Sequence, residues 1–334
     1  MKRKISLLSI ITTLICLCLC GCFNSGNEPY KTSFRSFDTL CSVTIYDNKT
    51  SAEYDNIQRN IKTACTKYNY SFDKYIPNSF IRNFNSIKHK IAKNDNYDVL
   101  KRSIELGDKT SGAFDITISP IVELWGVNTN HFNVPSDEKI KQELAKVNYR
   151  QLSLNGNSAR LTGGGSIDLG AIAKGFVADK LVESLKTMKI KSAIIDLGGN
   201  IYAIGSKKGK PFKVGIEKPF SHGKLIATVK AKDTSVITAG IYQRYKKKDG
   251  KIYSHIMDPK TGKPVDNDLN SVTVISKDAT AADALSTGFM VMGLEKGLAL
   301  ANSTDGVEAV FIDKNNTLHL TDGLIQEGKE ISLK

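Results

Sequence analysis

Ser-Ile-Asp-Leu-Gly-Ala-Ile-Ala-Lys-Gly-Phe-Val-Ala-Asp, residues 166–179, carries the strongest structural signal in this chain. Three glycines at 163–165 precede it, as expected of a turn before a regular element. The stretch then leads into a helical pattern, because its apolar residues recur on one side of a helix. The residues of that side are Ala171, Ala178, Leu181 and Leu185.

Small residues at the start of this helix leave the backbone accessible to a ligand. The first turn of a helix offers free N–H groups and a partial positive charge, which suit a phosphate or pyrophosphate. We expect Asp168 just before the helix and Lys174 about one turn inside it. The same pattern also fits close packing of a buried helix, so alone it predicts the helix and leaves the phosphate site open. The small residues are Gly170, Ala171, Ala173 and Gly175.

Residues 1–22 have the pattern of a segment that is removed or used for targeting. A basic start at residues 2–4 precedes an apolar run at 5–20, which is short for a membrane span. The run ends in Leu-Cys-Gly-Cys and looks like a lipobox with Cys22 as the lipidated residue; the alternative is a plain signal anchor. Two or three acyl chains would hold the protein stably at the extracytoplasmic face of the cell membrane. We expect a tether at residues 23–30 and one folded domain at 31–334.

Removal of the first segment changes the meaning of the six cysteines. Three leave with it and Cys22 is used for the lipid, so Cys41 and Cys65 remain in the folded part. Two cysteines make neither a disulfide framework nor a zinc site. Separate buried thiols or a single disulfide are both compatible with an oxidising compartment.

The formal charge is +13, and loss of the three basic residues at 2–4 leaves +10 (13 − 3). A basic balance can indicate nucleic-acid binding. Here the lysines are scattered, apart from three in a row at 246–248 in a hairpin-like stretch. Attraction to anionic lipid headgroups beside the anchor explains the charge, and we expect no nucleic-acid partner.

Periodicity predicts a mixed α+β fold, because strands and helices occur in blocks. Ser136 is a predicted helix N-cap, and Asn155-Gly156 predicts a hairpin. The expected helices lie at 57–68, 97–109, 137–146, the central stretch and 281–292. The expected strands lie at 41–46, 151–154, 159–161, 193–197, 201–204, 212–216, 225–229, 236–238 and 271–275, with a closing hairpin at 307–312 and 317–320.

Several motifs in fixed order resemble those of the ApbE family of FAD:protein FMN transferases, over roughly residues 30–325. The central stretch is one of them. The others are Phe37-Asp38-Thr39; Tyr75 with Ser79 and Asn85; Ser-Gly-Ala-Phe-Asp-Ile-Thr-Ile-Ser-Pro-Ile-Val-Glu-Leu-Trp-Gly at 111–126; Asp-Leu-Gly-Gly-Asn at 196–200; Ser-His-Ile-Met-Asp-Pro-Lys-Thr-Gly at 254–262; and Ala-Asp-Ala-Leu-Ser-Thr at 282–287. The resemblance implies a two-lobed α+β fold with antiparallel sheets and flanking helices. It also implies transfer of FMN from FAD to a Ser or Thr hydroxyl, with release of AMP.

Asp283 and Thr287 are four residues apart and so point to the same side of a predicted helix. A carboxylate and a hydroxyl are hard oxygen ligands that Mg²⁺ accepts, although such a pair can also be a cap or a surface hydrogen bond. The resemblance implies that both bind Mg²⁺ together with the backbone carbonyl of Ala171. Ser286 departs from family members that have a second aspartate there, which leaves the number of direct ligands open.

His255 follows a predicted strand, where a histidine can be purely structural. A neutral imidazole can also take a proton from a hydroxyl near pH 7. The resemblance implies this second role, with His255 tied to FMN transfer and Ile256 beside it as a contact of FAD.

Flavin contacts follow from the same resemblance. Aromatic faces at Phe37 and Tyr75 can stack on the flavin or adenine ring, or can belong to the core. The family match adds Ala113, Phe114 and Asp115 as further contacts. Asp168 and Lys174 also match FAD contacts, although some members have glutamate in place of Lys174.

The resemblance also suggests acceptors, which are flavoproteins such as subunits of Rnf or sodium-pumping NADH:quinone reductase complexes, or extracellular flavin-dependent reductases. Two alternatives remain: a Mg²⁺-dependent FAD pyrophosphatase that uses water as acceptor, and a flavin-binding lipoprotein without catalysis. A carrier has no need of a metal beside the pyrophosphate, so the Asp283–Thr287 pair and His255 argue against the latter.

Overall fold

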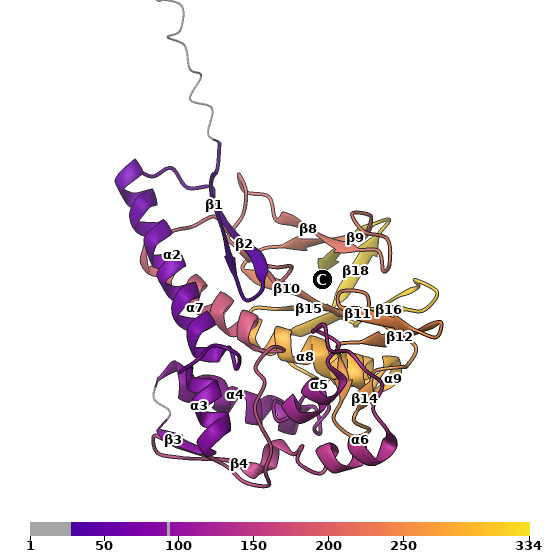
Figure 1. Ribbon diagram of the computed structural model, residues 1–334. Helices are drawn as coiled ribbons and strands as arrows, with labels where there is room; N and C mark the ends of the chain where they lie inside the picture. The colour runs from indigo at the N-terminus through magenta and orange to yellow at the C-terminus, as the bar shows by residue number, and fades with distance from the viewer. Residues whose placement is uncertain (1–27, 92–93) are drawn as a thin grey trace, which may run out of the picture.

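The computed structural model describes residues 28–91 and 94–334 (Figure 1). The helices are α2 (Ser51–Phe72), α3 (Phe80–Ile87), α4 (Asp95–Lys109), α5 (Ser119–Trp125), α6 (Asp137–Leu144), α7 (Ala173–Thr187), α8 (Ala279–Met292) and α9 (Leu294–Asn302), with a short 3-10 turn at Tyr149–Gln151. The strands are β1 (Tyr30–Ser36), β2 (Thr39–Ile45), β3 (His89–Ile91), β4 (Leu152–Asn155), β5 (Ser158–Leu161), β6 (Ala193–Leu197), β7 (Ile201–Ile204), β8 (Phe212–Glu217), β9 (Leu225–Ala231), β10 (Thr234–Gly240), β11 (Tyr245–Lys248), β12 (Lys251–Ser254), β13 (Met257–Asp258), β14 (Lys263–Pro264), β15 (Leu269–Ser276), β16 (Val307–Asp313), β17 (Leu318–Leu320), β18 (Leu324–Glu327) and β19 (Glu330–Leu333). This composition confirms the α+β class.

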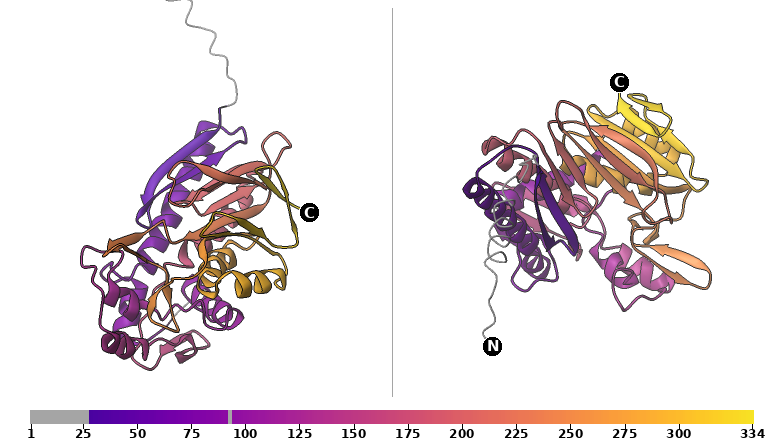
Figure 2. Two further views of the ribbon diagram at one scale, coloured as in Figure 1. Left: turned by 90° about the vertical axis from the view of Figure 1, so that its right-hand side faces the viewer. Right: turned by 90° about the horizontal axis from the view of Figure 1, so that it is seen from above.

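The largest sheet contains eight strands in the order β1-β2-β6-β7-β10-β15-β16-β17, and all of its pairings are antiparallel. All eight residues of β15 are buried, because both faces of the sheet are covered. Helices α7, α8 and α9 pack on one face, and the four-stranded sheet β18-β19-β9-β8 packs on the other (Figures 1 and 2).

Alternation along the strands creates the two cores. On β15, Val272 and Val274 join the large core beneath the helices, whereas Ile275 joins the smaller core between the two sheets. The large core continues into α3, α4 and the sheet β3-β5-β4, which form the lower part of Figure 1. The upper lobe, built on the eight-stranded sheet, and the lower lobe, built from α3, α4 and the sheet β3-β5-β4, therefore share one continuous core.

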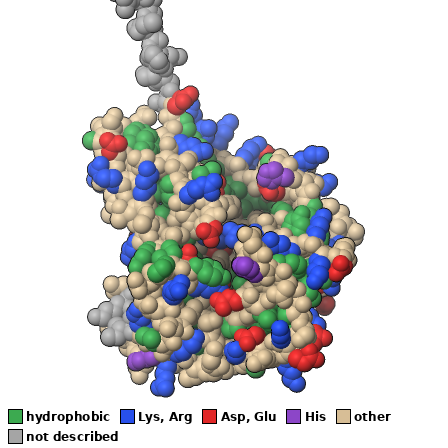
Figure 3. Space-filling model, viewed as in Figure 1, with side chains coloured by type: hydrophobic (Ala, Val, Ile, Leu, Met, Phe, Trp, Pro, Cys, Tyr) green, Lys and Arg blue, Asp and Glu red, His purple; other side chains and the backbone are tan. Residues whose placement is uncertain are grey.

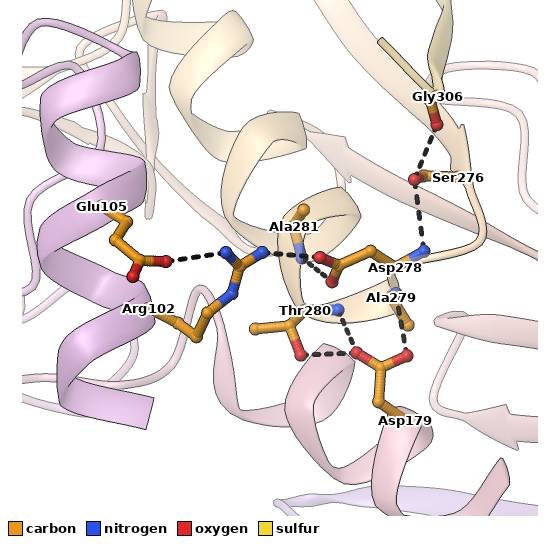
Figure 4. Close-up of polar contacts among 9 residues, drawn as sticks. All are labelled: Arg102, Glu105, Asp179, Ser276, Asp278, Ala279, Thr280, Ala281 and Gly306. Atoms are coloured by element: carbon orange, nitrogen blue, oxygen red, sulfur yellow. Dashed lines mark hydrogen bonds and ion pairs between the residues drawn. The ribbon is translucent and has the colours of Figure 1, made fainter. Parts of the chain in front are cut away.

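Two carboxylates hold the start of α8 (Figure 4). Asp278 caps the helix and forms an ion pair with Arg102 of α4 at 2.6 Å. Asp179 of α7 accepts hydrogen bonds from the N–H groups of Ala279 (3.0 Å) and Thr280 (2.8 Å). Burial raises the pKa of Asp179 to about 6, against the opposing effect of these hydrogen bonds. The network ties α8 to α4 and α7, so the helix that carries two predicted metal ligands has a fixed position.

A third, small core lies under α5 and α6. Trp125 is buried in it and donates a hydrogen bond from Nε1 to the carbonyl oxygen of Gly262 at 2.8 Å. Tyr253 of β12 packs on Trp125 and on Phe132, with ring centroids 5.8 and 5.5 Å apart. These contacts anchor the β11–β12 hairpin beside α5.

Several local expectations are confirmed. Ser136 caps α6, and β4 and β5 form the predicted hairpin, with Gly156 in its turn at φ 54°. Cys41 and Cys65 are separate, buried thiols, and burial raises their pKa values to about 11 and 12.

Two expectations are wrong. Helix α7 begins at Ala173, so Lys174 lies in its first turn and not one turn inside. The hairpin of β16 and β17 does not close the fold, because β18 and β19 follow and extend the second sheet, where β19 pairs in parallel with β9.

The predicted signal segment, Cys22 and most of the tether lie outside the described residues. Within residues 28–91 and 94–334, no helix combines the length and the apolarity that crossing a membrane requires.

Candidate active site

A cleft of about 1100 Å³ lies between the two lobes. Figure 3 shows this face of the molecule hollowed between its upper and lower parts, with charged side chains around the hollow. The cleft brings together segments far apart in the chain, from the β1–β2 turn to α8. The predicted site residues that line it are Phe37, Tyr75, Ala113, Phe114, Asp115, Asp168, Ala171, Lys174, His255, Ile256, Asp283 and Thr287.

The β1–β2 turn brings an aromatic ring to one end of the cleft. Phe37 and Asp38 occupy its two central positions at φ 52° and 55°, a conformation in which glycine or asparagine is usual. The N–H of Phe37 donates to Oδ1 of Asn69 on α2 at 2.7 Å. Next to the turn, a Cβ on Gly198 would lie 2.4 Å from side-chain atoms of Thr39, so the Thr39 side chain packs directly on the Gly198 backbone. Tertiary contacts thus hold a strained turn, as often occurs at functional sites.

Tyr75 presents a second aromatic face. Its side chain is 58% exposed, and Nζ of Lys74 lies 5.1 Å from the ring centroid. A half-exposed ring beside a fixed cation can stack on a planar ligand.

Lys74 links three elements at the floor of the cleft. Its Nζ forms ion pairs with Asp168 at 3.0 Å and Glu123 at 3.2 Å and donates to Oγ of Ser119 at 2.6 Å. Burial opposes the charge, but the two carboxylates outweigh it and raise the pKa of Lys74 to about 12. Asp168 also accepts from the N–H of Gly170 at 2.8 Å, which shapes the turn before α7.

The carboxylate of Asp115 organises the loop behind Tyr75. Its two oxygens accept from N–H and Oγ1 of Thr117 and from N–H of Tyr149, at 2.6–2.9 Å. Burial raises the pKa of Asp115 despite these bonds. Phe114 is 2% exposed and belongs to the large core. This block therefore positions the wall of the cleft, and its contact with FAD stays a prediction.

Asp283 and Thr287 lie on the wall formed by α8, and Asp283 is only 5% exposed. Oδ2 of Asp283 accepts a hydrogen bond from the N–H of Gly175 on α7 at 2.9 Å. A Cβ on Gly175 would lie 2.2 Å from the carbonyl oxygen of Ala279, so only glycine allows α7 and α8 to cross this closely. The hydroxyl of Ser286 donates to the carbonyl of Asp283 at 2.8 Å.

The oxygen donors of this wall fit a hard cation. A carboxylate, a hydroxyl and, on the facing segment, the backbone of Ala171 line the same cleft. Mg²⁺ takes few protein ligands and completes its shell with water and phosphate oxygens. The described part of the chain contains no cluster of three or more His, Cys, Asp or Glu side chains suited to a metal.

His255 is held by one carbonyl group. Both its backbone N–H and its Nδ1 lie within hydrogen-bond distance of the Arg244 carbonyl oxygen, at 3.1 and 3.0 Å. A carbonyl only accepts, so Nδ1 carries the proton and Nε2 has the free lone pair of a base. Burial lowers the pKa of His255 to about 4, and the charges of Arg244 and Lys174 act in the same direction. The imidazole is therefore neutral at pH 7.

Further residues that were not predicted as site residues also line the cleft. Phe220 and His222 come from the β8–β9 connection, and Tyr242 comes from the loop after β10. Asn200 closes the Asp-Leu-Gly-Gly-Asn motif, is 4% exposed and lines the cleft. Its Nδ2 is buried without a hydrogen-bond partner among the described residues.

The sequence of this chain is similar to those of proteins from one known family. Residues 37–311 match the ApbE family. The chain is 32% identical over 340 residues to the FAD:protein FMN transferase of Treponema pallidum (strain Nichols), covering 94% of each chain. It is 31% identical to that of Vibrio cholerae, covering 86% of this chain and 88% of the relative.

Solved structures agree. The ApbE protein of Thermotoga maritima superposes with a TM-score of 0.81 at 27% identity, covering 88% of this chain and 97% of that chain. The flavin transferase ApbE from Vibrio cholerae gives a TM-score of 0.80 at 29% identity and the same coverage. Matching motifs, matching fold and coverage of most of the sequence lead to one conclusion: the chain belongs to the ApbE family.

Proposed function

We propose that this chain is an FAD:protein FMN transferase, which moves the FMN part of FAD onto a hydroxyl group of an acceptor protein and releases AMP. Relatives that are 30–32% identical to this chain over most of its length are named FAD:protein FMN transferases. The observation that carries the mechanism is the single cleft in which a neutral histidine and a wall of oxygen donors occur together.

The exposed ring of Tyr75 and the half-buried ring of Phe37 suit the planar parts of FAD. The start of α7 suits its pyrophosphate. The N–H groups of Ala173 and Gly175 already donate to the Leu169 carbonyl and to Asp283, so the attraction for an anion comes from the partial positive charge of the helix start and from the Lys174 side chain.

Asp283, Thr287 and the carbonyl of Ala171 would hold Mg²⁺. When bound, Mg²⁺ neutralises phosphate charge and stabilises the charge that develops on the leaving phosphate. Gly175 contributes by fixing one oxygen of Asp283 through its N–H, so that the other oxygen is oriented.

His255 removes the proton of the acceptor hydroxyl at Nε2. The hydroxyl oxygen then forms a bond to the phosphorus of the FMN half, and the bond from that phosphorus to the bridging oxygen breaks. AMP leaves with the bridging oxygen, and the proton stays on the imidazole until it passes to solvent. The residues around this step contribute position and electrostatics, which dominate phosphoryl transfer.

The Leu-Cys-Gly-Cys sequence supports a location at the extracytoplasmic face of the membrane, with Cys22 as the lipid attachment site. Residues 23–30 would then act as the tether of the domain at 31–334. Acceptors within reach of such an anchor include subunits of Rnf or sodium-pumping NADH:quinone reductase complexes and extracellular flavin-dependent reductases.

The test is to incubate the full chain with FAD, Mg²⁺ and an acceptor flavoprotein, and to measure the acceptor's mass. We expect a mass increase of one FMN, with one AMP released for each. AMP and free FMN without labelled acceptor would assign the chain as an FAD pyrophosphatase. FAD binding without AMP would assign it as a flavin carrier.

A further inference from the structure

Three aromatic side chains, two exposed and one half-buried, form a lip at one edge of the cleft. Phe220 comes from the β8–β9 connection, Tyr242 follows β10, and Tyr245 begins β11. The ring centroid of Phe220 lies 5.9 Å from that of Tyr242 and 5.8 Å from that of Tyr245. We refer to Phe220, Tyr242 and Tyr245 as the aromatic lip.

Phe220 combines an exposed side chain with a strained backbone. Its side chain is 46% exposed, and its backbone lies at φ 54°, which is strained for a residue with a bulky side chain. A strained and exposed phenylalanine beside two tyrosines is typical of a contact surface.

The β11–β12 hairpin turns two chemically different faces outward. Tyr245 and Lys247 line the cleft, and Nζ of Lys247 lies 5.8 Å from the ring centroid of Tyr245. Side chains alternate along a strand, so Lys246 and Lys248 belong to the opposite face. Lys246 is paired there with Tyr253, which packs on α5.

The cleft-facing part of this edge has unneutralised positive charge. Arg244 and Lys247 are exposed, and neither forms an ion pair with an acid among the described residues. By contrast, Lys251 on the same hairpin pairs with Asp266 at 3.4 Å. Within residues 28–91 and 94–334, β11 pairs only with β12, so its outer edge also offers backbone groups to an extended chain.

We propose that the aromatic lip, Arg244 and Lys247 bind an acidic, extended segment of the acceptor protein and present its hydroxyl to His255. The carbonyl oxygen of Arg244 lies 3.0 Å from Nδ1 of His255. The proposed base therefore lies directly beside the residue that precedes β11. This inference rests on the proposed function, since it names how the protein substrate reaches the same site.

An anionic membrane surface is the other source of negative charge. It would meet Lys248, which is exposed on the opposite face, as readily as Lys247. The hairpin also lies beside α5, on a different side of the molecule from β1, where the described chain begins (Figures 1 and 2).

The experiment uses two synthetic peptides that each contain one threonine, flanked by aspartates in one and by lysines in the other. Binding to the FAD-loaded full chain is measured by fluorescence anisotropy at low and high salt. We expect tighter binding of the aspartate peptide, weakened by salt. Lys247→Glu should weaken it about tenfold, whereas Lys248→Glu, the same charge change on the other face, should leave it within about twofold.

Equal binding of the two peptides, or equal loss in both variants, overturns the proposal. If both variants also lose binding to phosphatidylglycerol vesicles equally, the hairpin is a membrane patch instead. Phe220→Ala, which keeps the Cβ and removes only the exposed ring, should weaken binding of the aspartate peptide with little change in the melting temperature. Unchanged peptide affinity counts against the aromatic lip. FMN transfer is measured separately. Selective peptide binding without FMN transfer rejects the proposed function and keeps the docking surface. FMN transfer together with unchanged peptide binding by Lys247→Glu supports the proposed function and rejects the docking surface.

Discussion

Gly175→Ala tests whether the crossing of α7 and α8 orients the predicted metal ligand. The added Cβ would lie 2.2 Å from the carbonyl oxygen of Ala279 and 2.7 Å from Cβ of Asp283. Backbone atoms of a helix cannot yield as a flexible side chain can, so the two helices must separate by about 1 Å. The hydrogen bond from Gly175 to Asp283 would then lengthen well beyond its present 2.9 Å.

Two opposing effects set the stability change. Alanine gains about 1 kcal/mol of helix propensity over glycine, whereas overpacking costs about 1–3 kcal/mol. The net loss of roughly 0–2 kcal/mol predicts a melting temperature that is lower by at most a few degrees. The larger effect falls on the metal site. Loss of a hydrogen bond to a charged group is worth about 1.5–3 kcal/mol, so the Mg²⁺ concentration for half-maximal transfer should rise at least about tenfold.

The assay is FMN transfer against Mg²⁺ concentration, with calorimetry on the same preparation. Gly297→Ala of α9 is the matched control, because its Cβ would meet the Phe311 ring at 2.9 Å and neither residue lines the cleft. It should lower the melting temperature and leave the Mg²⁺ dependence unchanged. In an Asp283→Ala background, Gly175→Ala should have no further effect on metal dependence. A destabilised Gly175→Ala enzyme with wild-type Mg²⁺ dependence would refute the orienting role, and a raised melting temperature would refute the packing argument.

Three further predictions concern individual residues. Asp283→Ala should abolish most Mg²⁺-dependent transfer yet retain FAD binding, and near wild-type transfer by the metal-stripped variant would reject the metal assignment. His255→Asn should reduce turnover by about 10²–10⁴-fold with little change in FAD affinity; a parallel loss of melting temperature and FAD binding would indicate a structural histidine. Because burial lowers the pKa of His255 to about 4, the wild-type acid limb should lie near pH 4 and not near ~6.5, and it should vanish in His255→Asn. The neutral, buried state of His255 also means that stability falls as pH drops from ~6.5 toward 4, since the unfolded chain binds the proton first. Cys22→Ala should prevent normal anchorage, and recovery of the variant as a correctly cleaved, membrane-bound chain would contradict lipidation.

Local pattern predicted the elements whose apolar residues repeat over several turns or strands. The Asp283–Thr287 spacing placed both side chains on one wall of the cleft because four residues complete about one helical turn. The start of α7 was misplaced, since Gly170 and Ala171 suit a helix and a turn equally well. The hydrogen bond from Gly170 to Asp168 and the ion pair of Asp168 with Lys74 select the turn. Strands β18 and β19 are short, and their pairing with β9 depends on the second sheet.

The cleft edge was beyond prediction for a different reason. Phe220 and Tyr245 meet only after two sheets have packed, and no local period relates them. The pKa of His255 likewise depends on burial and on Lys174, which is eighty-one residues away in sequence (255 − 174). The aromatic contacts and the pKa of His255 both depend on packing between segments that are distant in the sequence, so local sequence patterns do not predict them.

The placement of Lys174 near His255 has a kinetic consequence. Its positive charge contributes to the low pKa of the imidazole in the free enzyme. A pyrophosphate bound at the start of α7 brings negative charge to the same wall, which favours the protonated imidazole and so raises its pKa. The donor molecule thereby strengthens the base that will act on it. Because kcat/KM reports ionisation of the free enzyme and kcat that of the complex, the acid limb of kcat should lie at higher pH than that of kcat/KM.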